Sequence, residues 1–127
     1  MPSINRKPKI LFPLIKIHGG KWYLKNWIIS HFPVDYVNCN YYEPFIGGGS
    51  VFLNKARSIQ ESINDLDKDI YAVWRCTSKS SIFLDRIKNT FYDSSTFNHY
   101  KNKKIFYSMI ERAKCKFVVH RMSRGGL

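Results

Sequence analysis

The segment that most constrains the fold of this chain is a glycine-rich loop that begins with an acid, Glu43-Pro44-Phe45-Ile46-Gly47-Gly48-Gly49-Ser50-Val51-Phe52. The residues before it, 36–42, are rich in β-forming side chains, and a proline ends such a strand because it cannot donate to the ladder. Consecutive glycines free the loop backbone, and Ser50 can cap a helix that starts there. A strand, a loop and a helix are therefore predicted in succession.

A second strand is predicted within residues 58–63, and it ends at Asn64-Asp65. Strand, glycine loop, helix, strand and acid, in this order, predict the first half of a doubly wound α/β sheet. Before the loop, helical spacing predicts a helix over about 21–31. After Asp67, further helices are predicted, with an amphipathic helix in 96–119. Most of its aromatic residues are expected in the core: Phe97, Tyr100, Phe106, Tyr107 and Phe117.

The glycine loop does not fit the common phosphate-binding loops. A dinucleotide loop needs a third glycine where this chain has Phe52, and the Lys-Ser/Thr pair of a P-loop is missing. Glu43 would repel a pyrophosphate lying on the helix amino terminus, so a ligand with positive charge is expected there. S-adenosylmethionine carries such charge in its amino group and sulfonium. Asp65, 18 residues after Gly47, is placed to accept hydrogen bonds from both ribose hydroxyls.

The net charge of the chain is strongly positive. Lys and Arg number 21 against nine Asp and Glu, which gives a formal charge of +12 and predicts a polyanionic partner. Residues 100–127 carry eight of these cations and one acid. The alternative is a solvated, solubilising surface. Phosphate contacts are predicted for the following cations: Lys101, Lys103, Lys104, Arg121 and Arg124.

The cysteines and the amino-terminal segment indicate the cellular setting. Cys39, Cys76 and Cys115 are an odd set without metal-ligand spacing, so no disulfide framework and no metal site are predicted. The apolar stretch 10–15 is too short and proline-broken for a signal peptide or a membrane span. A cytoplasmic protein that does not enter a membrane is expected.

Three pieces of the sequence together resemble the motifs of the Dam-type (D12 class) adenine-N6 DNA methyltransferases, in the same order and spacing. They are Gly19-Gly20-Lys21, the loop 43–52 and Asn64-Asp65. Members of this family have a Gly-Gly-Lys segment that wraps the cofactor, a Glu-Pro-Phe-x-Gly-x-Gly-Ser-Val-Phe loop, and an acid that binds the ribose. The resemblance runs from about Lys16 to the end of the chain, where 124–127 look like a DNA-facing segment of the family.

The resemblance implies methyl transfer from S-adenosylmethionine to the exocyclic amine of adenine in double-stranded DNA, with the base flipped out. It implies the amino-terminal half of a class I, Rossmann-like methyltransferase fold, followed by helices of the DNA-facing region. Residues 1–95 would bind the cofactor, and 96–127 would begin a basic helical DNA-binding region. The expected cofactor-binding residues are His18, Gly19, Gly20, Lys21, Glu43, Pro44, Phe45, Gly47, Gly48, Gly49, Ser50 and Asp65.

The chain departs from the family pattern in one respect. An Asp-Pro-Pro-Tyr motif holds the reacting adenine in the family, but no two of the five prolines in this chain are adjacent. No catalytic residue is therefore predicted, and methylation is expected to need a second polypeptide that carries the catalytic half. A truncated gene product is the first interpretation and a split enzyme the second. The rival hypothesis is a non-enzymatic, basic nucleic-acid-binding module whose glycines are structural.

Overall fold

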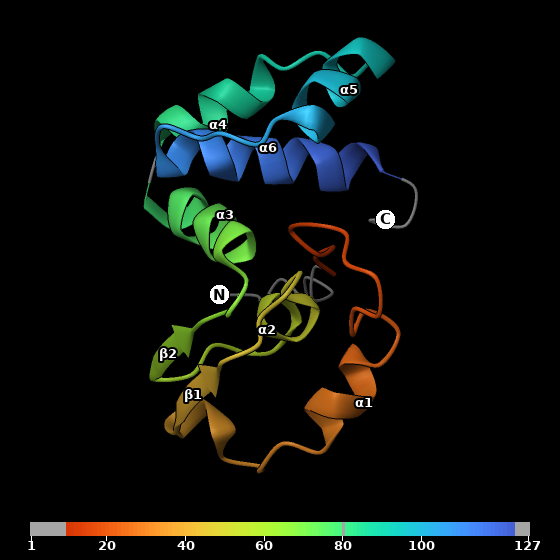
Figure 1. Ribbon diagram of the computed structural model, residues 1–127. Coiled ribbons are helices and arrows are strands. Elements are labelled where there is room, and N and C mark those ends of the chain that lie inside the picture. The colour runs from red at the N-terminus through yellow and green to blue at the C-terminus, as the bar shows by residue number, and fades with distance from the viewer. Residues whose placement is uncertain (1–9, 80, 124–127) are drawn as a thin grey trace, which may run out of the picture.

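The computed structural model describes residues 10–79 and 81–123 of the chain. The protein consists of helices and one pair of parallel strands in these residues (Figure 1). The elements in chain order are α1 Lys25–Ser30, the 3-10 helix η1 Tyr36–Asn38, β1 Asn40–Glu43, α2 Ser50–Asn54, β2 Gln60–Ile63, α3 Lys68–Lys79, α4 Ser81–Lys88, α5 Ser94–Asn102 and α6 Met109–Met122.

The strand pair has the connection that the sequence predicts. β1 and β2 are parallel, with Asn40 opposite Gln60 and Glu43 opposite Ile63. Parallel neighbours need a crossover between them, and the glycine loop with α2 supplies it. The loops that follow the two strands therefore leave the sheet at the same edge.

The first strand is shorter than the predicted strand over 36–42. Residues 36–38 form η1 instead, because the chain turns after Pro33: the N–H of Tyr36 donates to the Pro33 carbonyl at 3.0 Å. The N–H of Asn38 likewise donates to the Asp35 carbonyl at 2.8 Å. Backbone donors used within a turn are not available to a strand ladder, so β1 begins only at Asn40.

The predicted carboxyl-terminal helix is two helices. Asp93 caps α5 by accepting the N–H of Thr96 at 2.7 Å, and Ser108 caps α6 by accepting the N–H of Glu111 at 3.2 Å. Helix α6 lies between α3 on one side and α4 and α5 on the other (Figure 1). The aromatic residues here are less buried than expected, since Tyr107 is 89% exposed. The other aromatic residues named for this region are half-buried: Phe97, Tyr100, Phe106 and Phe117.

The hydrophobic core joins the loop region to the helices. Ile15 and Ile46, which lie outside helices and strands, belong to the same buried cluster as the inner residues of α3. The members of this cluster are Ile15, Ile46, Ile70, Ala72, Val73, Trp74, Cys76, Phe83 and Ala113. The glycine loop is thus anchored in the core on one side.

A buried ion pair fixes the end of α2 against the sheet. The side chain of Lys55 has no exposed area, and its ammonium pairs with the carboxylate of Glu61 on β2. The same ammonium lies 4.1 Å from the centroid of the Tyr41 ring and donates to the Ala56 carbonyl at 3.1 Å. A buried cation needs such partners, because its removal from water is costly.

We expect Lys55→Met to lower the free energy of unfolding by about 2 kcal/mol, because the partly buried Glu61 loses its counterion. Urea unfolding followed by circular dichroism measures this loss. The control is Lys103→Met, which breaks a more exposed pair with Glu111 and should cost clearly less. Equal losses in the two variants would contradict the role given to burial.

Candidate functional site

The glycine loop is held to the loop that follows β2 by backbone hydrogen bonds. The N–H of Asn64 donates to the Glu43 carbonyl and the N–H of Ile46 to the Asn64 carbonyl, both at 2.9 Å. These bonds continue the parallel pairing beyond the ends of the strands. The second and third sequence pieces are therefore side by side.

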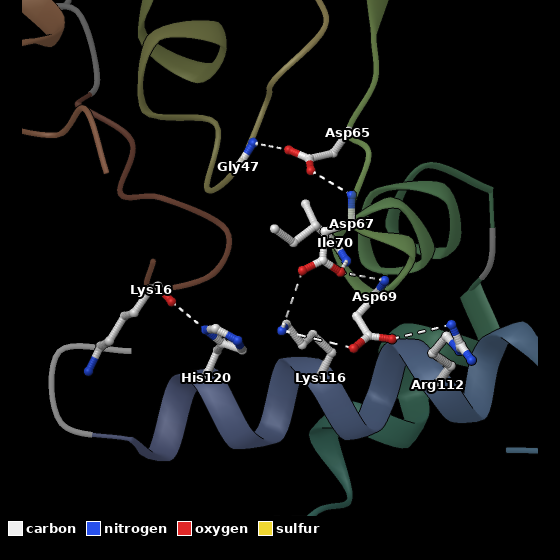
Figure 2. Close-up of polar contacts among 9 residues, drawn as sticks. All are labelled: Lys16, Gly47, Asp65, Asp67, Asp69, Ile70, Arg112, Lys116 and His120. Carbon is white, nitrogen blue, oxygen red and sulfur yellow. Dashed lines mark hydrogen bonds and ion pairs between the residues drawn. The ribbon is translucent and has the colours of Figure 1, made fainter. Parts of the chain in front are cut away.

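The carboxylate of Asp65 closes this arrangement. Its Oδ2 accepts the N–H of Gly47 at 2.9 Å and its Oδ1 accepts the N–H of Asp67 at 3.0 Å (Figure 2). Each oxygen of a carboxylate has two lone pairs, so each retains one for a further donor. Asp65 also lines a cavity of about 190 Å³ with Ile46, Asn64 and other residues. Its side chain is thus oriented by the backbone and remains able to accept hydrogen bonds.

The consecutive glycines are required by both conformation and packing. Gly47 and Gly49 have φ of 51° and 78°, in the left-handed region that favours glycine. A Cβ on Gly49 would lie 2.3 Å from the Trp74 ring, and one on Gly48 would lie 2.6 Å from the Ile15 carbonyl oxygen. The indole N–H of Trp74 donates to the Gly47 carbonyl at 2.7 Å. No local signal in the sequence predicts this contact of Trp74, which belongs to α3.

The predicted capping role of Ser50 is wrong. Gly49 occupies the N-cap position of α2, and no side chain makes a cap hydrogen bond there. The left-handed backbone of Gly49 explains this, because a capping residue normally has an extended backbone that points its side chain at the first turn. Ser50 is buried instead as the first residue of the helix.

Glu43 is buried at the end of β1 and joins the first sequence piece to the second. Its Oε2 accepts the hydroxyl of Tyr41 at 2.6 Å, and its Oε1 lies 3.7 Å from the ammonium of Lys21. Burial, and next the hydrogen bond to Glu43, raise the pKa of Tyr41 well above its usual range, so the phenol remains a donor. Lys21 also donates to the Phe45 carbonyl at 3.3 Å. This role of Tyr41 was not predicted, although Tyr41 and Glu43 are two residues apart on a strand and such residues point to the same face.

The segment around Gly19 and Gly20 forms an exposed turn. The N–H of Gly20 donates to the Ile17 carbonyl at 3.1 Å, and Gly19 has a φ of 74°. His18, Gly19 and Gly20 line a cavity of about 370 Å³ together with Gly48 and Ser50. This cavity is distinct from the one lined by Asp65, so the predicted residues adjoin one another around the loop but do not line a single cavity.

Two other predicted residues flank the loop at its start. Pro44 is half-buried and Phe45 is 70% exposed.

Helix α6 contacts the segment that precedes the exposed turn. His120 of α6 is hydrogen-bonded through Nδ1 to the carbonyl of Lys16, which lies just before that turn (Figure 2). Because a carbonyl only accepts, Nδ1 carries a proton, and burial lowers the pKa of His120 below its usual value.

The predicted phosphate-binding cations fall into separate groups. Lys101, Lys103 and Lys104 line one cavity of about 280 Å³. Arg112 and Lys116 of α6 line the same cavity, although no phosphate contact was predicted for them. Lys103 is paired with Glu111; this contact raises the pKa of Lys103 and lowers that of Glu111.

Arg121 lies elsewhere. It belongs to α6 and lines another cavity of about 440 Å³ with Lys16 and Tyr92. Arg124 is outside the described residues, as is the rest of the 124–127 segment. The lysines and Arg121 therefore do not share one cavity.

The described residues contain neither a membrane-spanning helix nor a metal-binding cluster. In residues 10–79 and 81–123, every helix is too short or too polar to cross a bilayer. The same part of the chain contains no cluster of His, Cys, Asp and Glu side chains that could hold a metal ion. Cys39, Cys76 and Cys115 are free thiols.

The fold and site together define an α/β protein with a glycine loop and an acid at the carboxyl ends of adjacent parallel strands, where such folds bind ligands. The family model for D12 class N6 adenine-specific DNA methyltransferases matches residues 18–123. The chain belongs to this family. Its mixed helix and strand content with two parallel strands is compatible with part of a methyltransferase fold. A search of the curated proteins gives no match.

We expect Gly49→Ala to lower the free energy of unfolding by about 3 kcal/mol, from the left-handed backbone and the clash with Trp74 together. Gly19→Ala is the matched control, because Gly19 has a similar φ but no atom within 4 Å of an added Cβ. It should cost only about 1 kcal/mol. Urea unfolding of both variants measures the difference, and equal costs would exclude a packing role for Trp74.

Proposed function

We propose that these residues form the S-adenosylmethionine-binding part of a DNA adenine-N6 methyltransferase with a class I, Rossmann-like fold. The observation that carries the proposal is the contact of Asp65 with the Gly47 amide, within the region that the family model matches. It supports a nucleoside site because an oriented carboxylate beside a glycine loop suits a ribose with two neighbouring hydroxyls. The protein would act in the cytoplasm.

The proposed ligand orientation follows from charge. The ribose hydroxyls would donate to the free lone pairs of Asp65, and the positively charged amino acid end would approach Glu43. Glu43 already has a cation partner in Lys21, whose side chain is 45% exposed. A ligand ammonium would compete for this carboxylate, and Lys21 could then meet the ligand carboxylate. His18, Gly19 and Gly20 would cover the ligand from the exposed turn.

The adenine-holding Asp-Pro-Pro-Tyr motif that the resemblance leads one to expect is not among these 127 residues. We therefore assign cofactor binding to residues 1–95 and the start of DNA binding to 96–127. Methyl transfer would need the adenine-holding motif from outside these 127 residues, and a second polypeptide is one source of it. The described sheet has two strands, so β1 and β2 each have one edge that is free to pair with a further strand.

The first test is Asp65→Ala, titrated with S-adenosylhomocysteine by calorimetry. Loss of two hydrogen bonds to a charged acceptor should weaken binding at least about tenfold, while binding to double-stranded DNA changes little. Asp85→Ala, which removes an exposed acid of α4, is the control and should bind both ligands like the wild type. A folded wild type that binds DNA but not the cofactor product would favour the non-enzymatic nucleic-acid-binding module instead.

The second test concerns the phosphate contacts. Lys101 and Lys104 line the cavity of about 280 Å³ and have no acid partner among the described residues. The double variant Lys101→Met with Lys104→Met should reduce the salt dependence of DNA affinity by about 1.8 in the slope of log K against log salt, at about 0.9 per phosphate. Fluorescence anisotropy at several salt concentrations measures this slope. The double variant Lys79→Met with Lys88→Met removes the same charge from α3 and α4, and an equal effect there would refute a local contact.

A further inference from the structure

A chain of polar contacts leads from the glycine loop to α6 (Figure 2). It starts with Gly47 and Asp65 and passes to the N–H of Asp67, which donates to Asp65. The Asp67 carboxylate in turn accepts the N–H groups of Asp69 at 2.8 Å and Ile70 at 3.3 Å, and so caps the start of α3. The turn that carries Asp65 is thereby tied to the first turn of α3.

Two cations of α6 complete the chain of contacts. The ammonium of Lys116 lies 3.9 Å from Oδ2 of Asp67 and 4.0 Å from Oδ2 of Asp69. The guanidinium of Arg112 lies 3.5 Å from Oδ1 of Asp69. Lys116 is held in place by the packing of α6, since its side chain is only 21% exposed and Ala113 belongs to the same buried cluster as Ile70.

Lys116 offsets the negative charge of neighbouring acids at the start of α3. Asp65, Asp67 and Asp69 alternate along a short stretch of chain, and their like charges repel one another. Lys116 is the one described cation that lies within ion-pair distance of both Asp67 and Asp69. Its ammonium balances the charge of Asp67 while the other oxygen of Asp67 caps α3. The N–H of Asp67 donates to Asp65. Without Lys116, Asp67 loses its one ion pair with α6 among the described residues.

We infer that Lys116 is a positioning residue for Asp65: from α6 it fixes Asp67, and through Asp67 it holds the Asp65 carboxylate on the amide of Gly47. The relevance of this role to cofactor binding rests on the proposed function. The positioning itself rests only on the contacts. A helix of the basic carboxyl-terminal region thus controls the geometry of the glycine loop, more than 60 residues earlier in the chain by the numbering of Gly47 and Lys116.

The experiment compares Lys116→Met, which keeps the apolar stem, with Lys116→Arg, which keeps the charge. Lys114→Met is the matched control, because Lys114 is on the same helix and contacts the Tyr100 ring, not an acid. Amide hydrogen exchange by NMR, without ligand, is measured at Gly47, at Asp67 and at Ile28 of α1. Lys116→Met should exchange roughly threefold faster at Gly47 and Asp67, the size expected for loss of one partly exposed ion pair.

The other measurements in this series decide between positioning and general stability. Lys116→Arg and Lys114→Met should exchange like the wild type, and Ile28 should be unaffected in every variant. Unchanged exchange at Gly47 and Asp67 in Lys116→Met, or an equal increase at Ile28, would overturn the inference. If circular dichroism shows that Lys116→Met does not fold, Asp67→Asn takes its place, because it removes the same ion pair and keeps an oxygen for the cap.

The affinity for S-adenosylhomocysteine separates this inference from the proposed function. If the wild type binds, Lys116→Met should weaken binding roughly threefold and Lys116→Arg should restore it. If the wild type does not bind, the proposed function fails, while the exchange at Gly47 and Asp67 still supports or overturns the positioning role of Lys116.

Discussion

The hydrogen bond between the Gly47 amide and the Asp65 carboxylate joins the two loops on which the candidate site is built. It forms because β1 and β2 are parallel, so that the loops following Glu43 and Ile63 leave the sheet at one edge. An antiparallel pair would have placed these loops at opposite edges. A pair of four-residue strands is therefore enough to bring together residues that are 18 positions apart.

The conformation of the glycine loop is set by its surroundings, because consecutive glycines by themselves allow the backbone many conformations. Trp74 bonds the Gly47 carbonyl and covers Gly49, while the N–H of Leu14 donates to the Gly48 carbonyl at 2.8 Å. The loop is thus enclosed between α3 and the segment before the Gly19-Gly20 turn. Sites of this kind need support from a packed scaffold, because a loop alone does not hold a carboxylate or an amide in a fixed position.

The order of strand, loop, helix, strand and acid could be predicted from the sequence, since each step has a local signal in β-forming residues, glycine or proline. Two predictions were wrong because another local signal competed with them. The turn after Pro33 makes β1 begin later than predicted, and the left-handed Gly49 occupies the cap position that was predicted for Ser50. The break between α5 and α6 was not predicted, because residues 103–108 contain no proline or glycine to mark it. The contacts of Trp74 and Lys116 could not be predicted, because they depend on how α3 and α6 pack against the loops, and residue spacing within one helix does not encode that orientation.

The cations of the carboxyl-terminal region differ in whether they have an acid partner. Lys103, Arg112 and Lys116 have acid partners, whereas Lys101 and Lys104 line the same cavity with no acid partner in the described part of the chain. A phosphate entering this cavity would meet the unpaired lysines at least cost, because the paired cations must first give up a carboxylate. A phosphate that reached Lys116 would compete with Asp67 for the same ammonium. If Lys116 positions Asp65 as inferred above, a phosphate bound at Lys116 and a ligand bound at Asp65 would change each other's affinity by the same factor, because coupling between two binding sites is reciprocal.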